Sequence, residues 1–289
     1  MRVVFFARVT PVDVVGWARI ELYMGAFRHL PRRLRRIAYY KLLRLHDYKG
    51  TRRARGQTAW GDAMWLKPGD YVDDYLLCDG VWEPHVIAQL ETKLAGGGWF
   101  FDVGAHIGSV TLAAARILGE RGRVVAFEPT PTTFARLSEN VRLNDARNVT
   151  LVNLAVGTAP GMVKLDGGNH GNSGRSRIST GAGAESAMTT LDAFWTSMGR
   201  PPVRLVKIDV EGFELGVLQG ATALLATGPS LLLELTPVGE LGDLDRSREV
   251  LRLVAAAGYD VQRWVEGAGW LDGEVPLDRQ WDLCLTART

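Results

Sequence analysis

The stretch WFFDVGAHIGS, residues 99–109, decides the fold. Three apolar residues lead into Asp102, and Gly104 and Gly108 then stand on either side of His106. A strand that runs into a glycine turn usually marks the binding loop of a cofactor. Gly104 permits backbone torsions that a side chain would forbid, and Gly108 lets the following helix approach the strand.

An alternating rhythm of strands and helices extends from this stretch. Seven strands are predicted, at residues 99–103, 124–128, 149–153, 205–209, 231–235, 259–264 and 280–287. Helices are expected at residues 109–118, 133–144, 213–226 and 248–258. Continuous apolar strands that alternate with helices predict an α/β fold, with a mainly parallel sheet covered on both faces. Only a glycine-rich segment joins the last two strands, which predicts a hairpin-like antiparallel edge.

Composition sets the broad class. The chain has 289 residues, 46% of them hydrophobic, which suits one large domain or one domain with an appendage. Cys78 and Cys284 are too few for a disulfide framework or a zinc site, and we expect two buried thiols. No apolar run reaches the roughly 18 residues of a membrane-spanning helix. The N-terminus lacks a cleavage site of small residues, so we expect a cytoplasmic protein.

The N-terminal part is unusually basic. Although the whole chain has a net charge of only +2, residues 28–56 hold eleven Lys or Arg and one acid, Asp47. The spacing of the leucine and isoleucine residues predicts a basic amphipathic helix after Pro31. We interpret residues 1–75 as a basic, partly helical extension and residues 76–289 as the main domain. Residues 28–56 are either a solvated face or a docking surface for an anionic partner or a membrane surface.

Residues 157–189 break the rhythm, since they are rich in Gly, Ser, Ala and Asn. Within them, the sequence MVKL predicts a short strand that extends the sheet. A loop of this length in a compact domain is either a lid over a site or a surface loop.

Polar residues follow four of the predicted strands. Asp102, Glu128, Asn153 and Asp209 each end a strand, and Glu211 comes two residues after the last of these. Ligands of parallel sheets bind beyond the carboxyl ends of the strands, so these groups are expected to converge. Glu128 lies twenty residues after Gly108, where a carboxylate can accept both hydroxyls of a ribose. The pattern therefore indicates a nucleoside-containing cofactor.

The turn favours a methyl donor over a dinucleotide. His106 stands where the dinucleotide fingerprint has its second glycine, and its side chain would occupy the space of a pyrophosphate. The carboxylate of Asp102 would repel phosphates but attract an ammonium or sulfonium group. S-adenosylmethionine carries both of these cations and no phosphate.

Longer motifs make the chain resemble the FkbM-type family of class I S-adenosylmethionine-dependent methyltransferases. The resemblance covers roughly residues 80–237 and rests on FDVGAHIGSVTLAAA, VVAFEPTPTTFARLSENVRLN, TLDAFW and VKIDVEGFELGVLQGA. It implies a Rossmann-like seven-stranded sheet whose last strand is antiparallel. It also implies methyl transfer to a hydroxyl of a small molecule, a glycan or a natural product.

The resemblance also implies site residues. The cofactor-binding residues that it implies are Glu83, Asp102, Gly104, Ala105, His106, Gly108, Glu128, Asn153 and Asp209. The family usually has asparagine at the position of His106, and both side chains can donate a hydrogen bond. The candidates for the catalytic groups are Asp209, Glu211 and His170, with His85 and His106 as further possible bases, and no metal is expected.

Two alternative functions are also compatible with the sequence. A methyltransferase acting on nucleic acid or on nitrogen would explain the basic segment, but RPPVR (residues 200–204) lacks the aromatic residue of the Pro-Pro-aromatic motif. No recognisable nucleic-acid module is present, which speaks against nucleic acid as a partner. A non-catalytic protein that binds the cofactor is another alternative, and the N-terminal segment could mediate oligomer formation.

Overall fold

The computed structural model describes residues 30–45, 53–166, 177–179, 184–239 and 242–288. The chain divides into two compact units, Met1–Trp82 and Glu83–Thr289. The domain boundary between residues 75 and 76 stays a prediction.

The described part of the first unit holds two helices and a hairpin. Its elements are α2 (Arg32–Leu45), β1 (Ala54–Gln57), β2 (Ala63–Leu66) and α3 (Tyr71–Asp79). Strands β1 and β2 pair in antiparallel fashion. The predicted basic helix after Pro31 is confirmed as α2.

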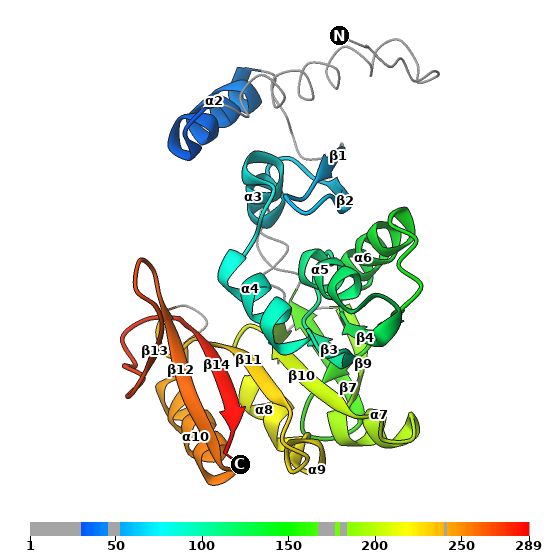
Figure 1. The fold of residues 1–289 in the computed structure, drawn as a ribbon, viewed down its shortest axis with the longest axis vertical. Coiled ribbons are helices and arrows are strands. Elements are labelled where there is room, and N and C mark those ends of the chain that lie inside the picture. Colours follow the sequence, from blue (N-terminus) through cyan, green and yellow to red (C-terminus); the bar gives the residue numbers. More distant parts are fainter. Residues whose placement is uncertain (1–29, 46–52, 167–176, 180–183, 240–241, 289) are drawn as a thin grey trace. The chain divides into compact units, whose positions relative to one another are not determined.

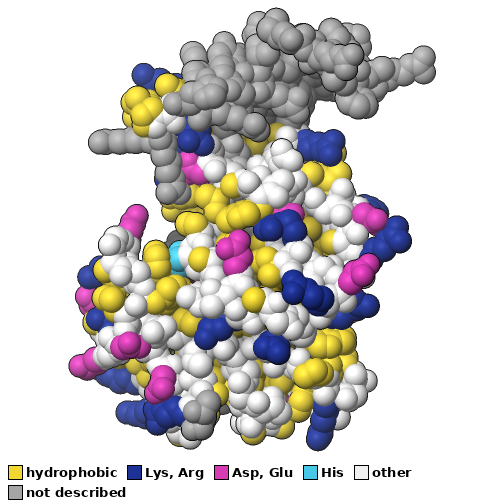
Figure 2. Space-filling model, viewed as in Figure 1, with side chains coloured by type: hydrophobic (Ala, Val, Ile, Leu, Met, Phe, Trp, Pro, Cys, Tyr) yellow, Lys and Arg dark blue, Asp and Glu magenta, His cyan; other side chains and the backbone are white. Residues whose placement is uncertain are grey.

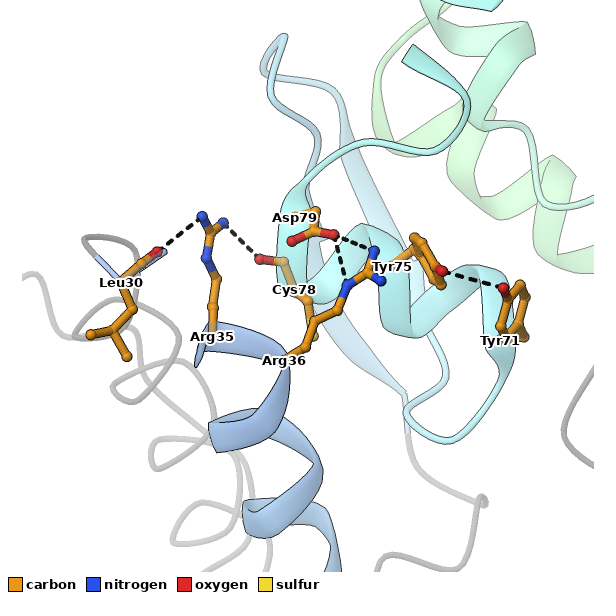
Figure 3. A network of polar contacts seen from close by, with 7 residues as sticks. All are labelled: Leu30, Arg35, Arg36, Tyr71, Tyr75, Cys78 and Asp79. Atoms are coloured by element: carbon orange, nitrogen blue, oxygen red, sulfur yellow. Dashed lines mark hydrogen bonds and ion pairs between the residues drawn. The ribbon is translucent and has the colours of Figure 1, made fainter. Parts of the chain in front are cut away.

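Two arginines fasten α2 to α3, as Figure 3 shows. Arg35 donates a hydrogen bond of 2.9 Å to the carbonyl oxygen of Cys78. Arg36 forms an ion pair of 2.6 Å with Asp79, and its guanidinium carbon lies 3.7 Å from the ring centroid of Tyr75. These arginines therefore serve the packing of the unit and do not belong to a freely solvated basic face.

Some apolar side chains of α2 are buried, and others are exposed to solvent. Among the described side chains of α2, Tyr39 is the one packed most deeply, and its hydroxyl donates a buried hydrogen bond of 2.6 Å to Asp74. Leu34 and Ile37 are 50% and 46% exposed, and Lys41, one helical turn further, is exposed too. Because a helix repeats every 3.6 residues, these last three residues share one face.

The second unit is built on one large sheet (Figure 1). Its eight strands lie in the order β13-β12-β14-β11-β10-β3-β4-β5. In chain order they are β3 (Gly98–Val103), β4 (Gly122–Phe127), β5 (Val149–Val152), β10 (Val203–Ile208), β11 (Ser230–Leu235), β12 (Tyr259–Val265), β13 (Gly269–Asp272) and β14 (Trp281–Ala287). Its helices are α4 (Pro84–Lys93), α5 (Ser109–Leu118), α6 (Pro131–Leu143), α7 (Leu191–Ser197), α8 (Glu214–Gln219), α9 (Thr222–Leu225) and α10 (Leu244–Ala256).

The pairing of the strands confirms the predicted fold class and adds one strand at the edge of the sheet. The neighbours β11, β10, β3, β4 and β5 pair in parallel, and β14 is antiparallel to both β11 and β12. All seven predicted strands are present, with the last one antiparallel. The antiparallel pairing expected for the last two strands is confirmed by β12 and β14, but the glycine-rich link between them forms an eighth strand, β13, which takes the edge of the sheet.

Apolar strands with both faces buried account for this layering. Residues of β3, β4, β10 and β11 are almost completely buried, and α7 to α10 contribute to the same core as Val103, Phe127 and Leu233. On α4, His85, Gln89 and Lys93 contact residues 282, 284 and 286 of β14, so this helix lies along that strand. The helix predicted over residues 213–226 is interrupted between α8 and α9. Gly220 lies at this interruption, and its backbone is packed so closely that a Cβ atom there would lie 2.0 Å from the carbonyl oxygen of Gly157.

The glycine-rich region after β5 contains a second sheet. Its four strands lie in the order β6-β9-β7-β8, with bounds β6 (Ala155–Val156), β7 (Gly161–Asp166), β8 (Arg177–Ser179) and β9 (Ala184–Thr189). The sequence MVKL does form a strand, β7, but the expectation that it extends the main sheet was wrong. Residues 167–176 and 180–183, on which the lid hypothesis depends, lie outside the described residues.

Cys78 and Cys284 are buried free thiols, as predicted. In the described part of the chain, no helix has the length and apolar character needed to cross a membrane. On the face of the second unit seen in Figure 2, basic and acidic side chains are interspersed.

Candidate functional site

The glycine turn after β3 is held against the end of β10. The N–H groups of Gly104 and Ala105 donate to the carbonyl oxygen of Phe127, at 3.0 and 2.9 Å. Gly104 has φ +86°, and a Cβ atom there would lie 1.8 Å from the carbonyl oxygen of Asp209. Only glycine fits a backbone contact of this kind. The turn therefore brings the loops after β3 and β10 together.

Glu128 joins the loop after β4 to the same turn. Its carboxylate accepts hydrogen bonds from the backbone N–H groups of His106, at 3.1 Å, and Thr130, at 2.9 Å. Burial raises the pKa of Glu128 to about 7, against the opposing effect of these hydrogen bonds. His106 has φ +49°, which aims its N–H at this carboxylate. The amide of Asn153 donates to the carbonyl oxygen of Glu128 at 2.7 Å and so ties in the loop after β5.

Asp102 and Gly108 lie beneath the turn. Asp102 is fully buried, and one of its oxygens accepts a hydrogen bond of 2.6 Å from the Thr111 hydroxyl in the first turn of α5. Its other oxygen has no hydrogen-bond partner, and burial raises its pKa. A Cβ atom on Gly108 would meet Leu137 of α6 at 2.6 Å, so this glycine permits a helix–helix approach and not the predicted helix–strand approach.

A small pocket that is partly open to solvent lies beyond the ends of β10 and β11. Its lining residues are Glu83, Val86, Lys207, Asp209, Leu232, Leu233, Glu234, Trp270, Asp282 and Leu283. Strand register explains the convergence: Glu234 pairs with Asp282 on β14, and Ile208 pairs with Leu233, which places Asp209 beside Glu234. Side chains of one face of the sheet thus meet here from three neighbouring strands.

The one basic side chain in the pocket lining is buried. Lys207, 5% exposed, forms an ion pair of 2.6 Å with Asp209. Burial alone would lower the pKa of this ammonium, but the carboxylates of Asp209, Glu83 and Asp102 outweigh burial and raise it. Burial, and then the charges of Asp209, Glu83, Asp282 and Glu211, raise the pKa of Glu234 well above its ordinary value.

The start of α4 and the strand β13 form the other walls. Glu83, the residue before α4, has a left-handed backbone with φ +49°. His85 forms a contact of 2.7 Å with Asp282 and stacks on Trp264, with ring centroids 4.8 Å apart and planes at 10°. Trp270 pairs with Trp264 across the β12–β13 hairpin, and its ring centroid lies 5.5 Å from that of Trp264.

The acids of the pocket have the spacing of a possible cation site. Oxygens of Glu83, Asp209 and Glu234 lie within 4.8 Å of one another. The ammonium of Lys207 already supplies positive charge to Asp209, which lowers the need for a metal ion there. The expectation of no metal stays a prediction.

The structure gathers most of the predicted site residues along one edge of the sheet. The turn residues, Glu128 and Asn153 form one group, and Asp209 and Glu83 belong to the adjoining pocket. Glu211 follows Asp209 in a left-handed conformation with φ +51°. His170 lies outside the described residues. The functional roles predicted for all of these residues stay predictions.

Sequence reasoning undervalued four residues of the pocket. It did not single out Lys207, Glu234, Asp282 or Trp270, all of which line the pocket. A signal was present: a charged residue inside an otherwise apolar strand, as in LVKID and LLLEL, is costly to bury unless it is paired or used.

A strand, a glycine turn and a helix, followed by an acid at the end of the next strand, define a Rossmann-like domain of the class that binds nucleoside cofactors. The chain belongs to the FkbM methyltransferase family: the family description "Methyltransferase FkbM domain" matches residues 102–261.

Several proteins are similar to parts of this chain. Over 155 residues it is 32% identical to hexuronic acid methyltransferase AglP of Haloferax volcanii, which covers 53% of this chain and 62% of that protein. A 70-residue part is 37% identical to a probable cobalt-precorrin-6B C(15)-methyltransferase (decarboxylating) of Sulfolobus acidocaldarius, covering 24% of this chain and 36% of that protein. The chain thus spans less than two thirds of these relatives.

Among solved structures, the chain is similar to the O-methyltransferase TomG of Streptomyces achromogenes, with a TM-score of 0.44 and 13% identity. TomG is involved in tomaymycin synthesis and was solved in complex with SAM. That match covers 72% of this chain and 82% of TomG.

Proposed function

We propose that this protein is an S-adenosylmethionine-dependent methyltransferase that methylates a hydroxyl oxygen of a small molecule, a glycan or a natural product. The observation that carries the proposal is the contact between the glycine turn and Asp209 in a chain of this family. This contact makes a cofactor loop and a polar pocket neighbours, as a transfer reaction between two bound molecules requires.

The residues of the turn suit this cofactor. The Glu128 carboxylate accepts two backbone N–H groups and keeps lone pairs that can accept the hydroxyls of a ribose. Asp102 has one buried oxygen without a partner and supplies negative charge beneath the turn, which favours a cationic ligand. When bound, S-adenosylmethionine supplies a methyl group on a positively charged sulfur.

The pocket supplies the groups that the acceptor needs. A hydroxyl that attacks a methyl group loses its proton during or after the attack, and a nearby carboxylate can take that proton. We assign this role to Asp209, which lines the pocket, and keep Glu211 and His170 as further candidates. Lys207 holds one oxygen of Asp209 at 2.6 Å and so fixes the orientation of the carboxylate.

Replacing Glu128 with alanine should weaken the binding of S-adenosylmethionine about 100-fold. Two lost hydrogen bonds to a carboxylate, each contributing about 1.5 kcal/mol, account for this factor. Isothermal titration calorimetry measures the change, and an unchanged affinity would contradict the assignment.

The affinity of the unmodified protein should also rise as the pH increases from 6 to 8. The pKa of Glu128 is raised to about 7, so the ionised form with its full set of acceptors appears across this interval. Glu128→Gln should abolish this rise. Glu214→Gln is the matched control, since Glu214 is equally buried and burial raises its pKa to about 7 as well, but its carboxylate accepts from Gly212.

We also propose that residues 28–56 dock the protein on an anionic membrane surface. The segment has eleven Lys or Arg and one Asp, and nine basic residues remain when Arg35 and Arg36, which pack against α3, are set aside. On α2, exposed Leu34 and Ile37 share a face with exposed Lys41, which suits a helix that lies in a lipid interface.

Leu34→Ser combined with Ile37→Ser should reduce cosedimentation with phosphatidylglycerol vesicles at least about fivefold, because apolar contact adds to charge attraction at an interface. Met162→Ser combined with Leu244→Ser, exposed residues of the second unit, is the control. Binding that is equal on neutral phosphatidylcholine vesicles, or insensitive to salt, would argue against an anionic surface.

A further inference from the structure

The lining of the pocket is strongly unbalanced in charge. Four carboxylates, those of Glu83, Asp209, Glu234 and Asp282, face one ammonium, that of Lys207. If Glu234 holds a proton, as the raised pKa of this carboxyl allows, three negative charges still oppose one positive charge. The pocket is therefore negative in either protonation state of Glu234.

The single ammonium is not free to receive an anion. Lys207 is 5% exposed, and its nitrogen lies 2.6 Å from an oxygen of Asp209. An entering carboxylate would have to compete with Asp209 for this ammonium while it approached Glu83 and Glu234. Like charges at such short range repel each other, most strongly where burial screens them least.

One wall of the pocket is a braced aromatic ring. Trp270 lines the pocket, and the rings of Trp264 and His85 lie 5.5 and 6.0 Å from it. His85 is itself fixed by its contact of 2.7 Å with Asp282. A ring held from two sides offers a flat apolar surface with an electron-rich face at little cost in conformational entropy.

We infer that the methyl acceptor of this pocket is an uncharged or cationic molecule rich in hydroxyl groups, such as a neutral sugar or an amino sugar, and not a uronate or another carboxylate. The inference rests on the proposed function, since it names the acceptor of the same site. The carboxylates accept hydrogen bonds from the hydroxyl groups of the acceptor, and its C–H face packs on Trp270. An amino group is attracted by the carboxylates and by the indole ring.

This inference separates the chain from the relative whose printed name specifies a hexuronic acid. A site for a hexuronate carboxylate needs a free cation at the acceptor. Among the described residues that line this pocket, the only Lys or Arg is Lys207, and Asp209 occupies it.

Three sugars that differ in one group test the inference. Methyl β-D-glucopyranoside, its 2-amino-2-deoxy analogue and the corresponding methyl glucuronoside are titrated against the full chain by saturation-transfer NMR, with and without S-adenosylhomocysteine. The neutral and amino sugars should bind at least about tenfold more tightly than the uronate, because only the uronate is repelled. Equal or tighter binding of the uronate, or no binding of the other two, overturns the inference.

Matched variants locate the effect. Glu83→Gln should reduce the preference against the uronate at least about threefold, because it removes one negative charge from the lining. Glu249→Gln, an exposed acid on α10, is the control and should leave the preference unchanged. Trp270→Ala should weaken the binding of the neutral sugar at least about fivefold. An unchanged affinity would show that the sugar does not pack on Trp270.

The proposed function fails by a different measurement. A chain that does not bind S-adenosylhomocysteine in calorimetry refutes the cofactor, whatever the sugars do. A chain that binds it and yet prefers the uronate keeps the proposed function and loses only this inference.

Discussion

Gly104→Ala is expected to destabilise the second unit by about 2–5 kcal/mol and to abolish cofactor binding. A left-handed backbone costs a residue with a side chain about 1–2 kcal/mol, and overpacking adds about 1–3 kcal/mol. The added Cβ atom would lie 1.8 Å from the carbonyl oxygen of Asp209, so the turn and the end of β10 have to move apart. Urea unfolding measures the loss of stability.

Gly258→Ala distinguishes the cost of a left-handed backbone from the cost of a steric clash. Gly258 has φ +81°, close to that of Gly104, but nothing lies within 4 Å of the position that a Cβ atom would take. This variant should cost only about 1–2 kcal/mol and leave cofactor affinity unchanged. If both glycine variants behave alike, the contact with Asp209 has no special importance for the turn.

Asp209→Asn is expected to lower turnover about 100- to 10,000-fold while the affinity for S-adenosylmethionine changes less than threefold. A positioned proton acceptor contributes about this factor to a reaction rate, and asparagine is a poor proton acceptor. The amide oxygen still accepts a hydrogen bond from Lys207, which preserves the local packing. A radiolabel transfer assay measures turnover, and calorimetry measures the affinity.

Asp260→Asn is the control for the loss of an ion-paired aspartate. Asp260 pairs with Arg288 at 2.8 Å, and both side chains are exposed, so this pair contributes little to stability. The control should keep full turnover. Full turnover in Asp209→Asn as well would reject Asp209 as a catalytic group.

The local signals of this sequence were strong enough to predict the main fold. The helix expected at residues 109–118 has those same bounds in the structure, because the glycine turn fixes its start and Gly119 its end. Strands such as β4 and β11 are mostly apolar, and that pattern does not depend on their neighbours. Glu128 could be assigned to the same region as Asp102 and Asp209, because the carboxyl ends of parallel strands lie at the same side of the sheet.

The errors concern features that only distant contacts decide. The position of β14 between β11 and β12 depends on pairing with strands that begin 51 and 22 residues earlier in the chain. The second sheet assembles from short strands that have little apolar pattern of their own. Likewise, no local pattern shows that Lys207, Glu234 and Asp282 meet in one pocket.

The location of β14 has a consequence for the synthesis of the protein on the ribosome. All other strands of the main sheet leave the ribosome before it, yet β14 fills the gap between β11 and β12. Until it arrives, both of these strands expose an unpaired edge, the kind of surface on which nascent chains aggregate. Asp282, on this strand, also completes the pocket wall. A prematurely released chain therefore lacks both a continuous sheet and a finished pocket, so translation itself determines when this pocket first exists.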